Sequence, residues 1–262
     1  MQDVQNRADA RGIAIQHVGI KDVYLPFQIK TKAGGFQPVL ARICFTVDLP
    51  QEYKGTHMSR FQEILVPWSQ KPLAEHELDE MLTEALDVLQ AQAAEVKLEF
   101  KYFVTKQAPV SGRESLLDVD CSFTGRKRRG EPLVFILGLA VPFTSLCPCS
   151  KEISAYGAHN QRSVSRVQLR YKPGYECIYI EDLADLLAEQ GSAQVYPLLK
   201  REDEKHVTEQ AYENPKFVED ILRDSVLALR SLKGLAWFSL ECENYESIHN
   251  HNAFASHEET LA

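Results

Sequence analysis

Apolar and polar residues alternate along several stretches of the chain, which is the period expected of a half-buried β-strand. Between the second and third of these stretches, apolar residues from Leu78 to Leu89 recur at spacings of three and four, which predicts an amphipathic helix. A short apolar segment that ends at Pro67 is a second helix candidate. In the first half of the chain the predicted strands are 14–30, 38–49, 96–104 and 116–123.

The second half repeats this order of elements. Alternating or continuously apolar stretches predict strands at 133–143, 163–171 and 235–242, and the tail from Ala253 is a further strand candidate. A short helix is predicted over 181–190. A longer one is predicted over 215–233, with Asn214 as its cap and Pro215 in its first turn.

Both halves therefore follow the order strand, strand, helix, helix, strand, strand. This order predicts an α+β protein in which antiparallel sheets carry their helices on one face. We expect an N-terminal module over 14–130, a C-terminal module over 131–262 that holds most of the active site, and a disordered tail over 1–13. Small open sheets expose their edges, and this favours assembly with further copies of the chain.

The composition of the 262 residues is that of an ordinary globular protein, with 44% hydrophobic and 25% charged residues. A net charge of −8 disfavours a nucleic-acid partner, because the chain repels a phosphate backbone. The longest apolar run, 133–141, is too short to cross a bilayer, and the polar start of the chain does not resemble a secretory leader. We expect a cytoplasmic protein without a membrane partner.

The most informative segment carries two cysteines around a proline, Cys147-Pro-Cys149, with His159 downstream. Thiolate and imidazole are ligands that transition metals accept in proteins, so this segment is a candidate metal site. A pair of structural thiols with an ordinary histidine nearby explains the same residues equally well. A hydrolytic metal site needs a third protein ligand, and the charged run from Leu199 to His206 offers Glu202 and Glu204. Taken alone, such a run is more typical of a solvated loop.

Two further groups of residues have chemical potential. Glu219 lies beside the apolar stripe of the predicted 215–233 helix, where a carboxylate would accept paired hydrogen bonds from a guanine edge or would simply face solvent. Near the C-terminus, His249 and His251 lie close to Glu246. A histidine oriented by a glutamate can transfer protons near neutral pH, although a polar loop is the simpler interpretation.

Taken together, these segments resemble one family, GTP cyclohydrolase I of type IB. No single motif is decisive, but the ordered set is specific and spans most of the chain. The matching stretches are Gly55-Thr-His-Met-Ser-Arg-Phe61, Cys147-Pro-Cys-Ser-Lys-Glu152, His159-Asn-Gln-Arg162, Asp203-Glu-Lys205 with Val207-Thr-Glu209, Ala211-Tyr-Glu-Asn-Pro-Lys-Phe-Val-Glu-Asp220 and Glu246-Ser-Ile-His-Asn-His251.

The resemblance implies a tunnelling fold, in which two tandem β-β-α-α-β-β modules assemble as a homotetramer. It also implies the reaction, in which GTP and water give 7,8-dihydroneopterin triphosphate and formate, the first step of tetrahydrofolate biosynthesis. One divalent metal ion per subunit, Zn, Mn or Fe, is implied with it. Such an ion lowers the pKa of bound water from 15.7 toward about 7 and so supplies a nucleophile for C8 of guanine.

The resemblance also assigns roles to individual residues. It implies Cys147, His159 and Glu204 as metal ligands, with Glu202 as the competitor for the third place, and Glu219 as the acid that anchors the purine. The catalytic residues would be Cys147 itself, His249 as general acid, Glu246 as the partner that orients it, and Cys149 as a hydrogen-bonding or relay group. Candidate residues for the triphosphate are Arg60, Lys151, Arg162, Arg166, Lys200 and Arg201.

Two alternatives remain open at this point. Another tunnelling-fold enzyme that acts on a pterin or deazapurine, such as a nitrile reductase, would use a lone nucleophilic cysteine and NADPH, and would leave the pair Cys147 and His159 unexplained. A non-catalytic metal or redox module would instead cycle a disulfide between Cys147 and Cys149. Formate release from GTP without nicotinamide would distinguish a GTP cyclohydrolase from the first alternative. Equal dependence of activity on both thiols would favour the second.

Overall fold

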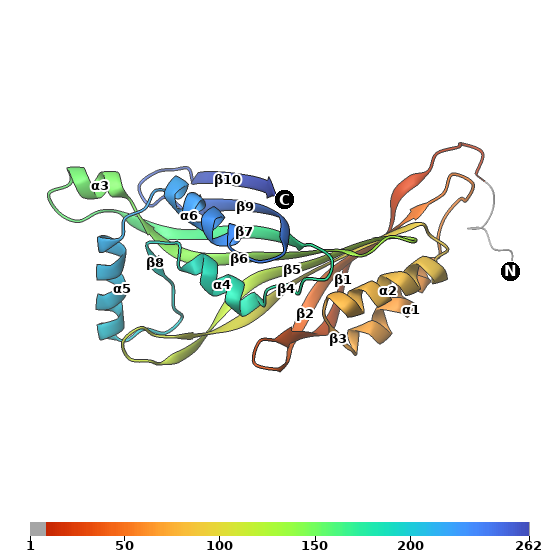
Figure 1. Cartoon of the computed structure of the whole chain (residues 1–262), viewed down its shortest axis with the longest axis horizontal. Helices are drawn as coiled ribbons and strands as arrows, with labels where there is room; N and C mark the ends of the chain where they lie inside the picture. Colours follow the sequence, from red (N-terminus) through yellow and green to blue (C-terminus); the bar gives the residue numbers. More distant parts are fainter. Residues whose placement is uncertain (1–8, 262) are drawn as a thin grey trace. The chain divides into compact units, whose positions relative to one another are not determined.

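The computed structural model describes residues 9–261 (Figure 1). Residues 1–8 of the predicted N-terminal tail lie outside the described residues. The helices are α1 (Met58–Ser69), α2 (Glu75–Val88), α3 (Pro148–Ile153), α4 (Ile180–Ala188), α5 (Arg201–Glu213) and α6 (Val218–Arg230). The strands are β1 (Ile15–Thr31), β2 (Gly35–Leu49), β3 (Pro72–Leu73), β4 (Ala93–Gln107), β5 (Glu114–Arg128), β6 (Val134–Leu146), β7 (Asn160–Tyr171), β8 (Ala193–Gln194), β9 (Leu235–Asn244) and β10 (Ala253–Thr260).

These elements form two compact units. The N-terminal unit contains the chain as far as Lys101 together with Ser122–Ile136, and the C-terminal unit contains Tyr102–Cys121 and the chain from Leu137 onward. The α+β class is confirmed, with mixed sheet pairing. The hairpin segment 102–121 groups with the C-terminal unit, whereas the predicted modules were continuous in sequence.

In the N-terminal unit the strand order is β3-β1-β2-β4-β5. β1 pairs antiparallel with β2 and parallel with the short β3. Helices α1 and α2 pack side by side on one face (Figure 1). The ring of Phe61 on α1 meets Phe45 on β2 edge to face, with centroids 5.1 Å apart. Gly125 on β5 lets α2 pack closely on this strand, because a Cβ there would lie 2.6 Å from the side chain of Leu78 and Leu78 would have to shift.

In the C-terminal unit the strand order is β4-β5-β6-β7-β9-β10, and β8 pairs with β6. The β6–β7, β7–β9 and β9–β10 pairs are antiparallel. Helix α6 packs on β9 and β10 and contacts α4. Apolar side chains of the strands, such as Phe143 and Phe238, and of the helices, such as Leu183 and Ile221, are fully buried. Alternation along the strands therefore gives each of them one face in the core.

Most of the predicted strands and helices are present, and two of the predictions about local structure were wrong. The charged run around 200–206, which is typical of a solvated loop, begins α5. Asn214 caps the C-terminus of α5 and does not start the next helix, since α6 begins at Val218 after Phe217 as its N-cap. Within residues 9–261, no helix combines the length and the apolar character that crossing a bilayer requires.

Candidate active site

Cys147 and His159 are neighbours because the strands beside them are paired. β6 ends at Leu146 and β7 begins at Asn160, and these two residues are register partners. One residue further out, the backbone N–H of Cys147 donates to the carbonyl oxygen of His159 at 3.1 Å. The antiparallel hairpin geometry therefore brings the predicted thiol and imidazole to one end of the β6–β7 pair.

The loop between the two residues is organised by Ser150. Its hydroxyl donates to the carbonyl oxygen of Cys147 at 3.1 Å and accepts from the backbone N–H of His159 at 3.2 Å. Cys147 is the N-cap of α3, with its Sγ 3.5 Å from the backbone nitrogen of Ser150, and Pro148 fills the first helical position, which needs no N–H donor. Cys149 lies within this helix and is exposed.

The imidazole of His159 is held between two polar side chains of the C-terminal unit. Its Nδ1 lies 3.0 Å from Oε1 of Gln161 and 4.0 Å from Oε2 of Glu246. The side chains of His159 and Glu246 are only 13% and 11% exposed. Glu246 was predicted to orient His249, whereas in the structure its carboxylate faces His159.

Helix α5 packs beside this end of the β6–β7 pair. Val207 and Ala211 join a small apolar cluster with Leu146, the residue before Cys147, and with Ala158, the residue before His159. Because an α-helix turns by about 100° per residue, Glu204 lies within about 20° of Ala211 around the helix, and Glu202 lies on the opposite side. Glu204 therefore shares the side of α5 that contacts these segments, about 10 Å further along the helix than Ala211.

Two of the three predicted metal ligands lie next to each other and have donor atoms that suit a divalent ion. Cys147 and His159 are adjacent and partly buried, and sulfur and imidazole nitrogen suit a transition metal. Across residues 9–261, however, no three His, Cys, Asp or Glu side chains are gathered closely enough to hold a metal ion. Glu204 is exposed and is not gathered with the pair, so the complete ligand set stays a prediction.

Asp203 has a structural position between the two predicted glutamates. Its side chain is fully buried and accepts from the backbone N–H groups of Val110, Ser111 and Lys200 at 2.8–2.9 Å, and from the Ser111 hydroxyl at 2.7 Å. Burial alone would raise the pKa of Asp203, but these hydrogen bonds outweigh it and hold that pKa well below its usual range. Asp203 thus fixes the first turn of α5 to the β4–β5 connection.

The remaining predicted catalytic and purine-binding residues lie on exposed segments. Glu219 is in the first turn of α6 and is exposed. His249 is exposed in the loop between β9 and β10, where its ring stacks on His251 with centroids 5.2 Å apart. The structure stacks His249 on His251, whereas the carboxylate of Glu246 faces His159, so the roles of these residues stay predictions.

The candidate triphosphate residues differ in whether their charges are already engaged. Arg60 on α1 donates to the carbonyl oxygen of Val88 at 3.1 Å, which closes the end of α2 within the N-terminal unit. Lys151 donates to the carbonyl oxygen of Tyr212, and Arg166 is paired with Glu241 and Glu243. Of the six candidates, three make no side-chain hydrogen bond or ion pair with the described residues: Arg162, Lys200 and Arg201.

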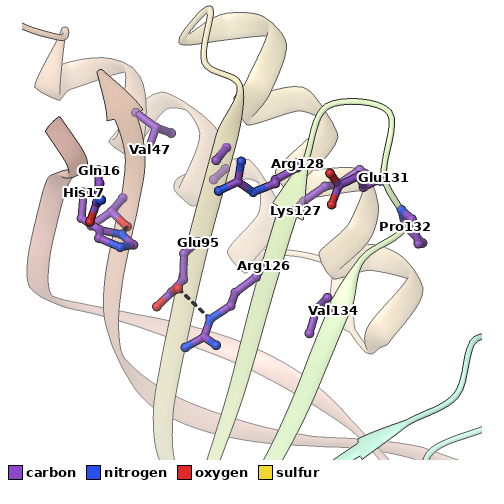
Figure 2. A pocket seen from close by; sticks show the side chains of 13 residues that line it. Gln16, His17, Val47, Glu95, Arg126, Lys127, Arg128, Glu131, Pro132 and Val134 are labelled. Atoms are coloured by element: carbon purple, nitrogen blue, oxygen red, sulfur yellow. Dashed lines mark hydrogen bonds and ion pairs between the residues drawn. The ribbon is translucent and has the colours of Figure 1, made fainter. Parts of the chain in front are cut away.

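A pocket of about 420 Å³ lies in the N-terminal unit and contains none of these residues (Figure 2). Arg126 on β5 points to Glu95 on β4, with 2.8 Å between Nε and Oε2 (Figure 2). Lys127, Arg128 and Glu131 also line the pocket, so three basic side chains face two acidic ones there. Arg126 and Arg128 belong to a run of four basic residues, 126–129. Lys127 and Arg129 of this run pair with Asp79 and Asp87 on α2, so the run contributes to the packing of that helix.

Comparison with known proteins decides the family. A family model described as type I GTP cyclohydrolase folE2 matches residues 1–255. The chain belongs to the FolE2 family. GTP cyclohydrolase FolE2 of Geobacter sp. (strain M21) is 50% identical over 256 residues, which are 98% of this chain and 94% of the relative. The FolE2 protein of Geobacter sulfurreducens is 49% identical over 259 residues, 99% of this chain and 98% of the relative.

Solved structures show the fold that this FolE2 protein shares. Uricase from Arthrobacter globiformis superposes with a TM-score of 0.56 at 7% identity, over 94% of this chain and 93% of the uricase. Urate oxidase from Bacillus subtilis 168 gives a TM-score of 0.54 at 10% identity, over 94% and 98% of the two chains. At such low identity these likenesses concern the fold alone.

The predicted resemblance to GTP cyclohydrolase I of type IB is therefore confirmed at the level of the family. Sequence reasoning did not single out two residues that organise this FolE2 site, Ser150 and Gln161. Gln161 was within the quoted stretch His159-Asn-Gln-Arg162, and Ser150 was within the Cys147 stretch. Their hydrogen bonds depend on how β6 and β7 pair, and the sequence pattern contains no direct signal for that.

Proposed function

We propose that this protein is a GTP cyclohydrolase that converts GTP and water to 7,8-dihydroneopterin triphosphate and formate, the first step of tetrahydrofolate biosynthesis. The observation that carries the proposal is the family match over residues 1–255, with relatives named GTP cyclohydrolase about 50% identical along nearly the whole chain. The adjacency of Cys147 and His159 supports it, because a thiol beside an imidazole is expected of a metal-dependent hydrolase of this kind.

A divalent ion, Zn, Mn or Fe, would be held by Cys147, His159 and Glu204. The packing of α5 supports Glu204 over Glu202, since only Glu204 shares the helix side of Ala211, which contacts the segments next to both other ligands. When bound, such an ion makes water acidic enough to supply hydroxide near neutral pH. A site with one thiolate favours zinc less strongly than a two-thiolate site, so several divalent ions should support turnover.

The protein's own groups would bind the base and move protons. Glu219 would accept from N1–H and the 2-amino group of guanine, which fixes the purine by two parallel hydrogen bonds. His249 would donate a proton to the imidazole-ring nitrogen of guanine, which makes C8 open to attack and lets the ring open with release of formate. Cys149, exposed on α3 beside Cys147, would hydrogen-bond or relay a proton there.

The ribose rearrangement and the closure of the pterin ring follow in the same site, which must also neutralise the triphosphate. Arg162, Lys200 and Arg201 are the best-suited cations, because the described residues leave their charges unpaired. Lys151 and Arg60 are secondary candidates, since both donate to backbone carbonyl groups.

We further propose the finer architecture that the sequence predicts, a tunnelling fold of two tandem β-β-α-α-β-β modules, at 14–130 and 131–262, that assembles as a homotetramer in the cytoplasm. The element order supports it: β1, β2, α1, α2, β4 and β5 come first. β6, β7, α4, α6, β9 and β10 follow, with α3, α5 and β8 as additions. The edge strand β10 keeps one side unpaired, which suits closure by further copies.

The test is the conversion of GTP by the purified, metal-loaded protein. Formate should be released without nicotinamide, and an oxidised product should show pterin fluorescence. A chelator should abolish both signals, and Zn, Mn or Fe should restore them. Cys147→Ala and His159→Ala should lose activity by a factor of about 10³ or more, while Lys21→Ala, an exposed control in the N-terminal unit, should keep it. Absence of formate from metal-loaded, folded protein would refute the proposal.

A further inference from the structure

A chain of buried polar side chains runs inward from His159. Nδ1 of the imidazole lies 3.0 Å from Oε1 of Gln161, and Nε2 of Gln161 lies 2.7 Å from Oγ of Ser145. The Ser145 hydroxyl is in turn 2.8 Å from that of Ser163. Gln161 is 7% exposed and both serines are fully buried. Burying a polar side chain is costly unless it is hydrogen-bonded, so this buried hydrogen-bonded series calls for a role beyond packing.

The orientation of the Gln161 amide determines which nitrogen of His159 carries the proton. The amide of Gln161 turns its oxygen to the imidazole and its nitrogen to Ser145, and an amide oxygen only accepts hydrogen bonds. Nδ1 of His159 must then carry the proton. A second acceptor faces the same atom, because Oε2 of Glu246 lies 4.0 Å from Nδ1. If the amide were reversed, its N–H would donate to Nδ1 of His159, and Nδ1 would carry a lone pair. That lone pair would face the carboxylate of Glu246, which is electrostatically unfavourable.

We infer that Gln161 is a positioning residue that holds His159 as the Nδ1–H tautomer and so presents Nε2, with its lone pair, as the metal-binding atom. The inference rests on the proposed function only for the identity of the ligand. Ser145 and Ser163 hold the Gln161 amide in place from fully buried positions on β6 and β7. Because a hydroxyl both donates and accepts, the direction of the amide is set by the carboxylate of Glu246 beside Nδ1. Partners of this kind typically change metal affinity by 10–100-fold when they are lost.

Three variants separate the roles of the groups. Gln161→Leu removes the acceptor and keeps a similar volume. Gln161→Glu keeps an oxygen toward Nδ1. Ser145→Ala releases the amide from its inner partner. The matched control is Gln168→Leu, because Gln168 lies on the same strand β7 with an exposed side chain that makes no hydrogen bond in the described part of the chain.

The first measurement is the tautomer of His159 in the metal-free protein, from long-range ¹H–¹⁵N correlation spectra of histidine-labelled samples assigned with His159→Ala. The second is zinc affinity, from competition with a chromophoric chelator at fixed pH. Wild type and Gln168→Leu should show the Nδ1–H tautomer and equal affinity. Gln161→Leu should mix the tautomers and bind zinc 10–100-fold more weakly, Ser145→Ala should fall between, and Gln161→Glu should restore most of the affinity.

Two results would overturn the inference: an Nε2–H tautomer in wild type, or a folded Gln161→Leu protein with unchanged tautomer and zinc affinity. If Gln161→Leu does not fold, the wild-type spectrum and Ser145→Ala still decide. Neither measurement uses GTP. A protein that shows the predicted tautomer and affinities but releases no formate would therefore refute the proposed reaction and leave the role of Gln161 intact.

Discussion

Ser111 binds both carboxylate oxygens of Asp203. Its backbone N–H donates to Oδ1 at 2.8 Å, and its hydroxyl donates to Oδ2 at 2.7 Å. Asp203 lies in the first turn of α5, and Ser111 lies in the connection between β4 and β5, so this contact joins two segments that are far apart in the sequence. The position of the adjacent Glu204 depends on it.

We predict that Asp203→Asn lowers the melting temperature by about 3–6 °C, because one carboxylate oxygen is replaced by a donor that faces other donors. Ser111→Ala should cost less, since its backbone N–H still donates. Because the folded-state pKa of Asp203 is lowered, its stabilisation is present above the unfolded pKa of about 4 and is lost as the pH falls below that value. Thermal unfolding of both variants between pH 3 and pH 7 checks this, and equal melting temperatures for Asp203→Asn and wild type at pH 7 would contradict it.

Lys106 and Asp185 form an ion pair with unequal burial, and the inequality predicts the effect of each substitution. The lysine side chain is 6% exposed and the aspartate is 59% exposed, with Gln194 Oε1 as the second partner of the ammonium at 3.0 Å. Asp185→Ala leaves a buried charge poorly compensated and should cost about 2 kcal/mol or more. Lys106→Met leaves a solvated carboxylate and should change stability by less than about 1 kcal/mol.

Urea unfolding of the two single variants and the double variant measures this difference. The double variant should be close to Lys106→Met, because no buried ammonium remains in either. Equal losses in the two single variants would show that burial of the lysine does not control the energetics of the pair.

The local patterns predicted much of the fold, and the failures have physical causes. Leu78 to Leu89 was sufficiently periodic to predict α2, and alternation predicted β1 and β2 almost to their ends. Helix α5 was missed because Asp203 and Ala211 are its only buried residues, so it has almost no apolar stripe. Asp203 and the apolar contact of Val207 and Ala211 hold this helix in place, and so few buried positions give no periodic signal in the sequence.

The candidate site was predictable to the extent that it depends on residue type. The residue types, a thiol and an imidazole, suggested Cys147 and His159 as a pair, and the register of β6 and β7 places their backbones side by side. The partner of Glu246 was not predictable in this way. Its carboxylate lies near His159 because of the path that the backbone takes after β9, and residue type gives no information on that path. Side-chain pairings across strands depend on register, which a single sequence specifies weakly outside buried faces.

The cysteines should differ strongly in reactivity. Cys242 is buried, and burial raises the pKa of its thiol to about 11, so almost no thiolate forms at pH 8. Cys149 is exposed on α3. In a thiol titration of the native protein, Cys149→Ser should remove one fast-reacting group, whereas Cys242→Ser should leave the fast phase unchanged. Fast labelling of Cys242 in folded protein would contradict its burial.

The raised pKa of Cys242 also affects stability. Its contribution to the stability of the fold is present below pH 9.0 and is lost as the pH rises toward about 11.

The two glutamates that flank Asp203 provide the sharpest test of the metal site. Glu204 and Glu202 are both exposed in the first turn of α5 and differ mainly in direction, because only Glu204 lies on the side of Ala211. If α5 presents a ligand to the ion held by Cys147 and His159, Glu204→Gln should weaken zinc binding by about 10–100-fold, and Glu202→Gln should not change it measurably. The two substitutions remove the same charge from the same helix turn, so any general electrostatic effect is shared by both. Chelator competition on the two variants and wild type measures the difference, with circular dichroism as the check of folding. A larger loss in Glu202→Gln would mean that α5 turns its other side to the metal, and equal affinities in all three proteins would remove α5 from the ligand set.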